Sequence, residues 1–228
     1  MMTRFGLVLT MVGYIMAAAS ALATEPSSGI DADAALQKLL NGNRSYVSSR
    51  MTMQSASGPE TRQALAAGQR PYAIILSCSD SRVPPEIIFD KGLGEIFVVR
   101  VAGNIPDPII IGSIEYAVEH LGSPLIMVLG HSRCGAVMAA VEVTGHEHGN
   151  IGAIVNIISP AVQMAKEETK GADKSQLIEA AVEMNVKLTA KSLVEHSQTI
   201  RSRVDSGKLK IVTAKYELDS GTVKLLGK

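Results

Sequence analysis

Tryptophan is absent from this chain of 228 residues, which has only three phenylalanines and five tyrosines. The formal net charge is zero, with 22 basic and 22 acidic residues, and no run of Lys or Arg occurs. Proteins that bind nucleic acid usually present a basic face and aromatic rings for stacking. The composition therefore argues against nucleic acid as a partner, whereas a small anion is compatible with it.

Cysteine is equally scarce, because Cys78 and Cys134 are the only two in the chain. A disulfide-rich scaffold is excluded, since at most one bridge can form. Internal repeats and low-complexity linkers are also missing from the sequence. Without the first 23 residues, the length is about one to one and a half times that of a typical domain. We therefore expect residues 24–228 to form a single domain with a full hydrophobic core.

The first 23 residues have the pattern of a secretory signal peptide. Arg4 precedes an apolar stretch at 5–19, and Ala-Leu-Ala at 21–23 is typical of a cleavage site. Polar and glycine residues interrupt the apolar stretch, so a retained membrane anchor is the weaker interpretation. We expect cleavage after Ala23 and export to the periplasm, with no membrane segment in the mature protein.

Three nearly continuous apolar runs, at 72–77, 95–100 and 125–130, predict strands that are buried on both faces. The stretch 107–122 begins with Asp-Pro and has apolar residues at helical spacing, which predicts a helix between the last two strands. Strands that alternate with helices indicate an α/β fold with a parallel sheet and right-handed crossovers. We expect about four parallel strands in the order 2-1-3-4, with flanking helices.

The other segments complete this architecture. Residues 209–218 predict the fourth strand, and 223–225 predict an antiparallel partner at the C-terminal edge of the sheet. Apolar periodicity and stop signals predict further helices at 31–40 (ended by Asn-Gly at 41–42), 59–67, 134–143, 151–170 and 173–204.

Both cysteines follow predicted strands directly. Cys-Ser-Asp-Ser-Arg at 78–82 comes after the first strand, and His-Ser-Arg-Cys at 131–134 comes after the third. If the first and third strands are neighbours, with the second outside the first, their carboxyl ends meet at a switch point of the sheet, where ligands bind. Two thiolates and an imidazole suit Zn²⁺, and three protein ligands leave the fourth position open, as in catalytic sites. Cys78, His131 and Cys134 are therefore candidate zinc ligands.

Other interpretations of the two cysteines stay open on spacing alone. Free cysteine is often a buried apolar residue, and an exported protein permits a Cys78–Cys134 disulfide. A thiol redox protein using the same pair is a further alternative, although it would lack the local Cys-x-x-Cys spacing. A zinc finger is not indicated, because no second pair of ligands closes the site.

The paired motifs resemble those of the β-class carbonic anhydrases, zinc enzymes that interconvert carbon dioxide and bicarbonate. Besides 78–82 and 131–134, Phe-Val-Val-Arg at 97–100 and Gly-Ser-Ile-Glu-Tyr-Ala at 112–117 occur in similar proteins. The resemblance extends from 39–44 to the C-terminal hairpin. It implies one Zn²⁺ per chain and reversible hydration of carbon dioxide by zinc-bound hydroxide. Hydrolysis of an analogue, carbonyl sulfide or carbon disulfide, is the alternative within the enzyme class.

The resemblance also implies roles for individual residues. Cys78, His131 and Cys134 match the family's zinc ligands. Asp80 and Arg82 match its Asp–Arg dyad, in which the carboxylate accepts a hydrogen bond from zinc-bound water. In an inactive closed form, Asp80 would instead become the fourth zinc ligand. The dyad is thus the candidate catalytic pair.

The substrate pocket of the family's plant-like branch corresponds here to Gln69, Phe97 and Tyr116. A second branch has a regulatory bicarbonate site with a tryptophan three residues before the first zinc cysteine, where this chain has Ile75. We therefore favour the plant-like branch, with Arg100 and Tyr216 as residues that could still serve a regulatory site.

The resemblance implies an oligomer as well. In the family, the N-terminal helices wrap a neighbouring subunit and the pocket forms at the dimer seam. The apolar stripe at 36–40 has no obvious partner of its own in the sequence. We therefore expect a homodimer or tetramer, with the N-terminal helices extending to a neighbouring subunit.

Overall fold

The computed structural model describes residues 27–143 and 148–227. The predicted signal peptide at 1–23 lies outside the described residues. Among the helices within these two ranges, none is both long enough and apolar enough to cross a lipid bilayer.

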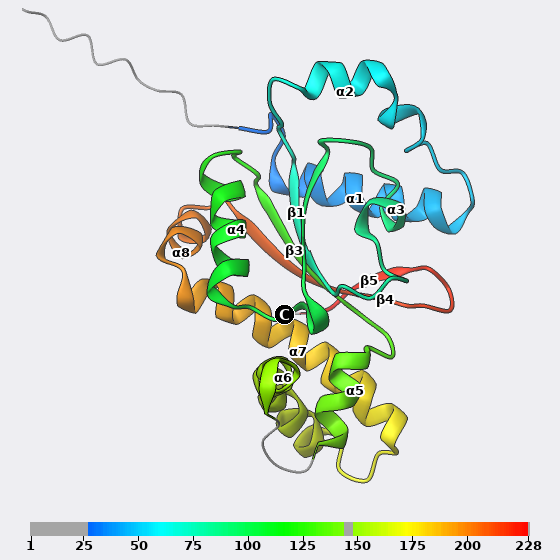
Figure 1. The fold of residues 1–228 in the computed structure, drawn as a ribbon, viewed down its shortest axis with the longest axis vertical. Coiled ribbons are helices and arrows are strands. Elements are labelled where there is room, and N and C mark those ends of the chain that lie inside the picture. Colours follow the sequence, from blue (N-terminus) through cyan, green and yellow to red (C-terminus); the bar gives the residue numbers. More distant parts are fainter. Residues whose placement is uncertain (1–26, 144–147, 228) are drawn as a thin grey trace, which may run out of the picture.

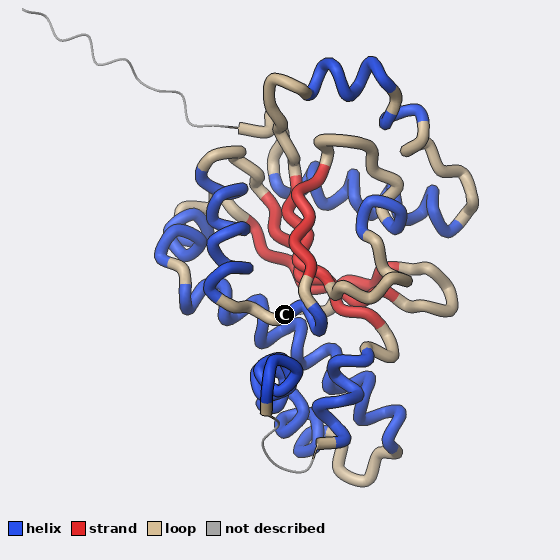
Figure 2. The backbone as a smooth tube through the Cα atoms, in the orientation of Figure 1, coloured by secondary structure: helices blue, strands red, loops and turns tan. Residues whose placement is uncertain are grey.

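A five-stranded sheet forms the centre of the molecule, in the order β2-β1-β3-β4-β5 (Figure 2). Its strands are β1 (Ala73–Ser77), β2 (Ile96–Arg100), β3 (Leu125–His131), β4 (Lys210–Tyr216) and β5 (Val223–Leu225). The first four are parallel, and β5 pairs antiparallel with β4. The predicted α/β class and strand order are thus confirmed. Every residue of β1 and β3 is buried, because helices cover both faces of the central strands.

Helices lie on both sides of this sheet (Figure 1). They are α1 (Ala32–Val47), α2 (Pro59–Leu65), α3 (Pro85–Ile88), α4 (Pro108–Glu119), α5 (Gly135–Glu142), α6 (Gly149–Glu168), α7 (Lys174–His196) and α8 (Gln198–Asp205), with short 3₁₀ helices η1 (Ser55–Ser57) and η2 (Ala102–Asn104). Helix α1 packs on one face, where its leucines join Ile75 and Met127. Helices α4 and α8 and part of α7 pack on the other, against Ile74 and Val128. Alternate residues of each strand therefore belong to two separate cores.

Helix α1 corrects two expectations. It continues beyond Gly42 to Val47, because Gly42 serves close packing rather than termination: an added Cβ would overlap the Phe89 carbonyl oxygen. The idea that its apolar stripe lacks a partner within the chain is wrong, since Leu36 and Leu39 are buried against the chain's own sheet. Helix α2, by contrast, has no buried residue.

The predicted helix at 173–204 is two helices. Ser197 interrupts it in an extended conformation, with φ −127° and ψ 113°, and its hydroxyl accepts the backbone N–H of Ile200 as the N-cap of α8. The same hydroxyl donates to Glu115 on α4. A serine inside a helical pattern can cap a new helix, and this tertiary partner favours the break.

Candidate metal centre

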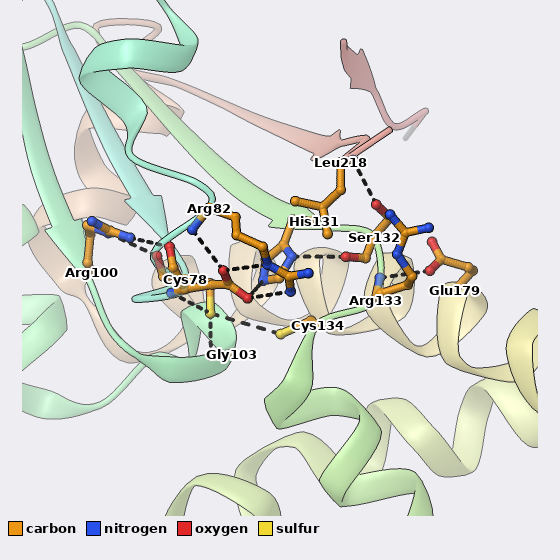
Figure 3. A network of polar contacts seen from close by, with 11 residues as sticks. Cys78, Arg82, Arg100, Gly103, His131, Ser132, Arg133, Cys134, Glu179 and Leu218 are labelled. Carbon is orange, nitrogen blue, oxygen red and sulfur yellow. Dashed lines mark hydrogen bonds and ion pairs between the residues drawn. The ribbon is translucent and has the colours of Figure 1, made fainter. Parts of the chain in front are cut away.

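The three candidate ligands converge at the carboxyl edge of the sheet (Figure 3). Cys78 follows β1, His131 is the last residue of the neighbouring β3, and Cys134 is the N-cap residue of α5. Their ligand atoms all lie within 4.8 Å of one another, and all three residues are buried. The topology therefore assembles the predicted set from segments 56 residues apart.

The separation of the sulfur atoms fits a shared metal ion. Cys78 Sγ and Cys134 Sγ are 4.0 Å apart, and both thiols are free. Two sulfurs on one tetrahedral zinc, each at about 2.3 Å, lie roughly 3.8 Å apart, whereas a disulfide requires about 2.05 Å. The pair is thus spaced as ligands of one ion.

The imidazole of His131 is oriented for the same purpose. Its Nδ1 lies 3.0 Å from the Ser132 carbonyl oxygen, which can only accept, so Nδ1 carries the hydrogen. Nε2 is then a lone-pair acceptor, and it is buried with no hydrogen-bond partner among the described residues. Leaving such an atom unsatisfied costs about 1–3 kcal/mol. A metal ion would satisfy Nε2, and a backbone carbonyl on the other nitrogen is the usual outer contact of a ligating histidine.

Contact between the two cysteines shifts their pKa values in opposite directions. The hydrogen bond between Cys78 and Cys134 lowers the pKa of Cys78, while burial opposes this effect, and the backbone N–H groups of Gly103 and Asp80 also lower it. The same contact, together with burial, raises the pKa of Cys134. The contact therefore favours the thiolate form at Cys78 over that at Cys134, and a divalent cation would favour deprotonation of both.

Asp80 and Arg82 lie beside the ligands as a bidentate pair. Arg82 Nε and Nη2 donate to the two carboxylate oxygens at 2.9 and 2.7 Å. These hydrogen bonds, with that of the Arg82 backbone N–H, hold the pKa of Asp80 well below its usual range. Asp80 Oδ2 is 3.8 Å from His131 Nε2. The carboxylate is thus ionised, bound to arginine and within reach of a molecule at the metal site.

The sequence did not predict that Arg100, Gly103 and Asn185 support the first ligand loop. Arg100 donates from Nε to the Cys78 carbonyl at 3.0 Å and from Nη2 to the Asp80 carbonyl at 2.7 Å. The backbone N–H of Gly103 contacts Cys78 Sγ at 3.3 Å, and Asn185 on α7 holds the Gly103 carbonyl at 2.8 Å. The segment Arg-Val-Ala-Gly-Asn at 100–104 lies where the second strand ends, at the same edge of the sheet. This position is the sequence feature that could have pointed to Arg100 and Gly103.

The two residues considered for a regulatory site have other partners here. The guanidinium of Arg100 donates hydrogen bonds to backbone carbonyls of the loop at 78–82, as described above. The Tyr216 hydroxyl lies 3.1 Å from the Tyr46 hydroxyl, and burial, followed by this contact, raises the pKa of Tyr216.

The predicted pocket residues are not brought to the metal ligands within one chain. Gln69 is exposed and precedes β1, whereas Cys78 follows that strand, which spans roughly 17 Å at about 3.3 Å per residue. Phe97 pairs with Ile74 near the start of β2. Its ring centroid is 6.3 Å from that of Tyr116, which is 48% exposed on α4. Phe97 and Tyr116 therefore form a partly exposed pair of their own.

Comparisons with known proteins agree with this geometry. The family model described as carbonic anhydrase matches residues 73–223. The chain is 40% identical to carbonic anhydrase 2 of Mycobacterium tuberculosis over 84% of this chain and 91% of the relative, and 37% identical to a carbonic anhydrase of Mycolicibacterium smegmatis over 84% and 92%.

Solved structures give the same result. A β-carbonic anhydrase of Coccomyxa superposes with a TM-score of 0.70 at 27% identity, covering 85% of this chain and 86% of that one. A tetrameric β-carbonic anhydrase of Sordaria macrospora gives 0.69 at 26%, covering 85% and 97%. The chain belongs to the β-class carbonic anhydrase family.

Proposed function

We propose that this chain is a zinc-dependent carbonic anhydrase that interconverts carbon dioxide and bicarbonate. Cys78, His131 and Cys134 would hold one Zn²⁺. The observation that carries this proposal is the buried Nε2 of His131, which has no hydrogen-bond partner in the described part of the chain and clusters with two thiols 4.0 Å apart in a chain of this family.

The three metal ligands and the Asp80–Arg82 dyad would have different roles in the reaction. When bound, zinc supplies the Lewis acidity that generates hydroxide from water near neutral pH. An ionised Asp80 can only accept hydrogen bonds, so it orients a reactant that carries a hydrogen, which is hydroxide or bicarbonate. Arg82 keeps the carboxylate ionised and turned toward itself by its bidentate contact, so that the carboxylate does not ligate the metal.

The substrate pocket is proposed to form between subunits. Gln69, Phe97 and Tyr116 lie away from their own chain's ligands, so they would line the site of a neighbouring subunit in a homodimer or tetramer. The absence of buried residues in α2 supports an N-terminal contact with that neighbour. Light scattering at assay concentration tests this, and an active monomer would contradict it.

Other activities are not favoured. A thiol redox protein using Cys78 and Cys134, or a hydrolase of carbonyl sulfide or carbon disulfide, would be compatible with the same ligands. The family match and the relatives reported above all concern carbonic anhydrases.

Stopped-flow hydration of carbon dioxide on metal-quantified protein tests the proposal. We expect the rate to rise in proportion to zinc content up to one ion per chain. Protein that is folded and fully loaded with zinc, yet no faster than buffer, would contradict it. Carbonyl sulfide as the substrate in the same assay tests the alternative that the protein hydrolyses this analogue.

We also propose export to the periplasm. The support is the sequence pattern of residues 1–23, with Arg4, an apolar stretch and Ala-Leu-Ala. Cell fractionation followed by N-terminal sequencing tests this, and a mature protein that still begins at Met1 in the cytoplasmic fraction would contradict it.

A further inference from the structure

The loop between the second and third ligands has an unfavourable backbone conformation. Arg133, which lies between His131 and Cys134, has a φ of +53°. The left-handed region costs roughly 1–2 kcal/mol for a residue with a Cβ, so surrounding contacts must hold it. Its backbone N–H donates to Glu179 Oε1 at 2.9 Å (Figure 3).

The other carboxylate oxygen of Glu179 contacts a lysine. Lys215 on β4 places Nζ 3.3 Å from Glu179 Oε2 and 2.8 Å from Glu183 Oε1. The Lys215 side chain is only 9% exposed, so its ammonium is largely shielded from water, although the carboxylates of Glu179 and Glu183 are partly exposed. Burial alone would lower the pKa of Lys215, but the surrounding carboxylates raise it, which keeps the ammonium charged. Glu179 thus links a buried cation to the backbone of the ligand loop.

The position of α7 relative to the loop is also restricted. Gly130 immediately precedes His131, and a Cβ there would lie 2.5 Å from Val186 Cγ2 on α7. Glycine therefore permits the helix to approach β3 closely, two turns from Glu179. The side chain of Glu179 reaches Arg133 from a helix whose distance from the ligand strand is set by packing.

We propose that Glu179 is a positioning residue for the metal centre. By accepting the Arg133 N–H, it holds the His131–Cys134 loop in the conformation that brings both ligands to one ion. The inference rests on the proposed metal site and adds a residue that does not touch the ion. Glu183, one turn along the same helix, binds the same lysine without touching the loop, and is therefore the matched control.

Two conservative variants of the full chain separate the effect of the Glu179 side-chain length from the effect of its charge. Glu179→Asp keeps the charge but withdraws the oxygen from the Arg133 N–H, whereas Glu179→Gln keeps an oxygen at that distance and loses the charge. We expect Glu179→Asp to weaken Zn²⁺ binding by about 10- to 100-fold in chelator competition. Glu179→Gln and Glu183→Asp should bind Zn²⁺ nearly as wild type does.

The absorption spectrum of the Co²⁺-substituted protein gives a second readout. Its ligand-field bands should shift in Glu179→Asp and stay unchanged in the other two variants, with circular dichroism confirming that all are folded. Wild-type affinity and spectrum in Glu179→Asp would overturn the inference, as would equal losses in Glu183→Asp or a loss confined to Glu179→Gln. A wild-type chain that binds no Zn²⁺ would overturn the proposed function and this inference together.

Discussion

The two ligand loops are held in different ways. In the loop at 78–82, Asp80 and Arg82 bind each other two residues apart, and Arg100 is 22 residues from the carbonyl it contacts. In the loop at 131–134, the backbone N–H of Arg133 donates to Glu179, 46 residues away, and the Ser132 hydroxyl accepts the backbone N–H of Leu218, 86 residues away. The first loop is therefore restrained mainly by neighbours in sequence. The second is restrained by the C-terminal third of the chain.

The largest expected effect is loss of the metal, and we expect it to be the same whichever loop loses its cysteine. Cys78→Ala and Cys134→Ala each remove one of three ligands, so zinc content should fall far below one per chain in both. Hydration activity should drop by at least about 10³-fold, because the site would lose the Lewis acid that activates water. Metal analysis and stopped-flow assays measure this. If Cys134→Ala kept its zinc while Cys78→Ala lost it, the second loop would not contribute a ligand.

The next effect is specific to the first loop. Arg82→Ala frees the Asp80 carboxylate, so activity should fall by about 10²-fold while zinc stays near one per chain. Asp80→Asn should lose a similar amount, and the double variant should be little worse than either, since the pair acts as a unit.

Asp219→Asn is the control for this pair, because it removes the bidentate Arg133–Asp219 contact of the second loop. It should leave turnover unchanged. If Arg82→Ala and Asp80→Asn lowered only stability or zinc occupancy, with normal turnover in the loaded fraction, the dyad would be merely structural.

A stability effect is expected where α7 meets β3. Gly130→Ala places a methyl group against Val186 and should lower the free energy of unfolding by about 1–3 kcal/mol in urea denaturation. Gly112→Ala is the control, since no atom of residues 27–143 or 148–227 outside the local helix lies within 4 Å of its added Cβ on α4. That change should be stabilising, because alanine favours a helix. Equal destabilisation by both would show that helix packing over β3 is not the cause.

The smallest effect concerns pH. Arg133 lowers the pKa of the exposed Asp219 carboxyl. Its contribution to stability is therefore present above the unfolded-state pKa of about 3.9 and is lost as the pH falls through the lower folded-state pKa. The small difference in melting temperature between wild type and Asp219→Asn should shrink below about pH 4 and in high salt. A difference that persists in acid would require another cause.

Much of the site was predictable because its chemistry follows strand ends. The apolar runs of β1 and β3 predicted neighbouring strands, and the residues after them predicted one metal site. The supporting contacts were less visible. Glu179 looks like any charged residue on a helix surface, Asn185 shows no local pattern that links it to Cys78, and Gly103 was marked only by its place after the second strand.

The amino-acid sequence by itself determined where the strands lie along the chain and which three residues are candidate ligands, because hydrophobic periodicity and ligand type are local properties of the chain. It also indicated the Asp80–Arg82 pair, because these two residues are only two positions apart in the chain. Only the tertiary structure decided that α1 continues through Gly42, that Ser197 divides a helix, and that Glu179 supports the Arg133 backbone. Each of these depends on how closely elements distant in sequence approach each other, and that distance is set by packing.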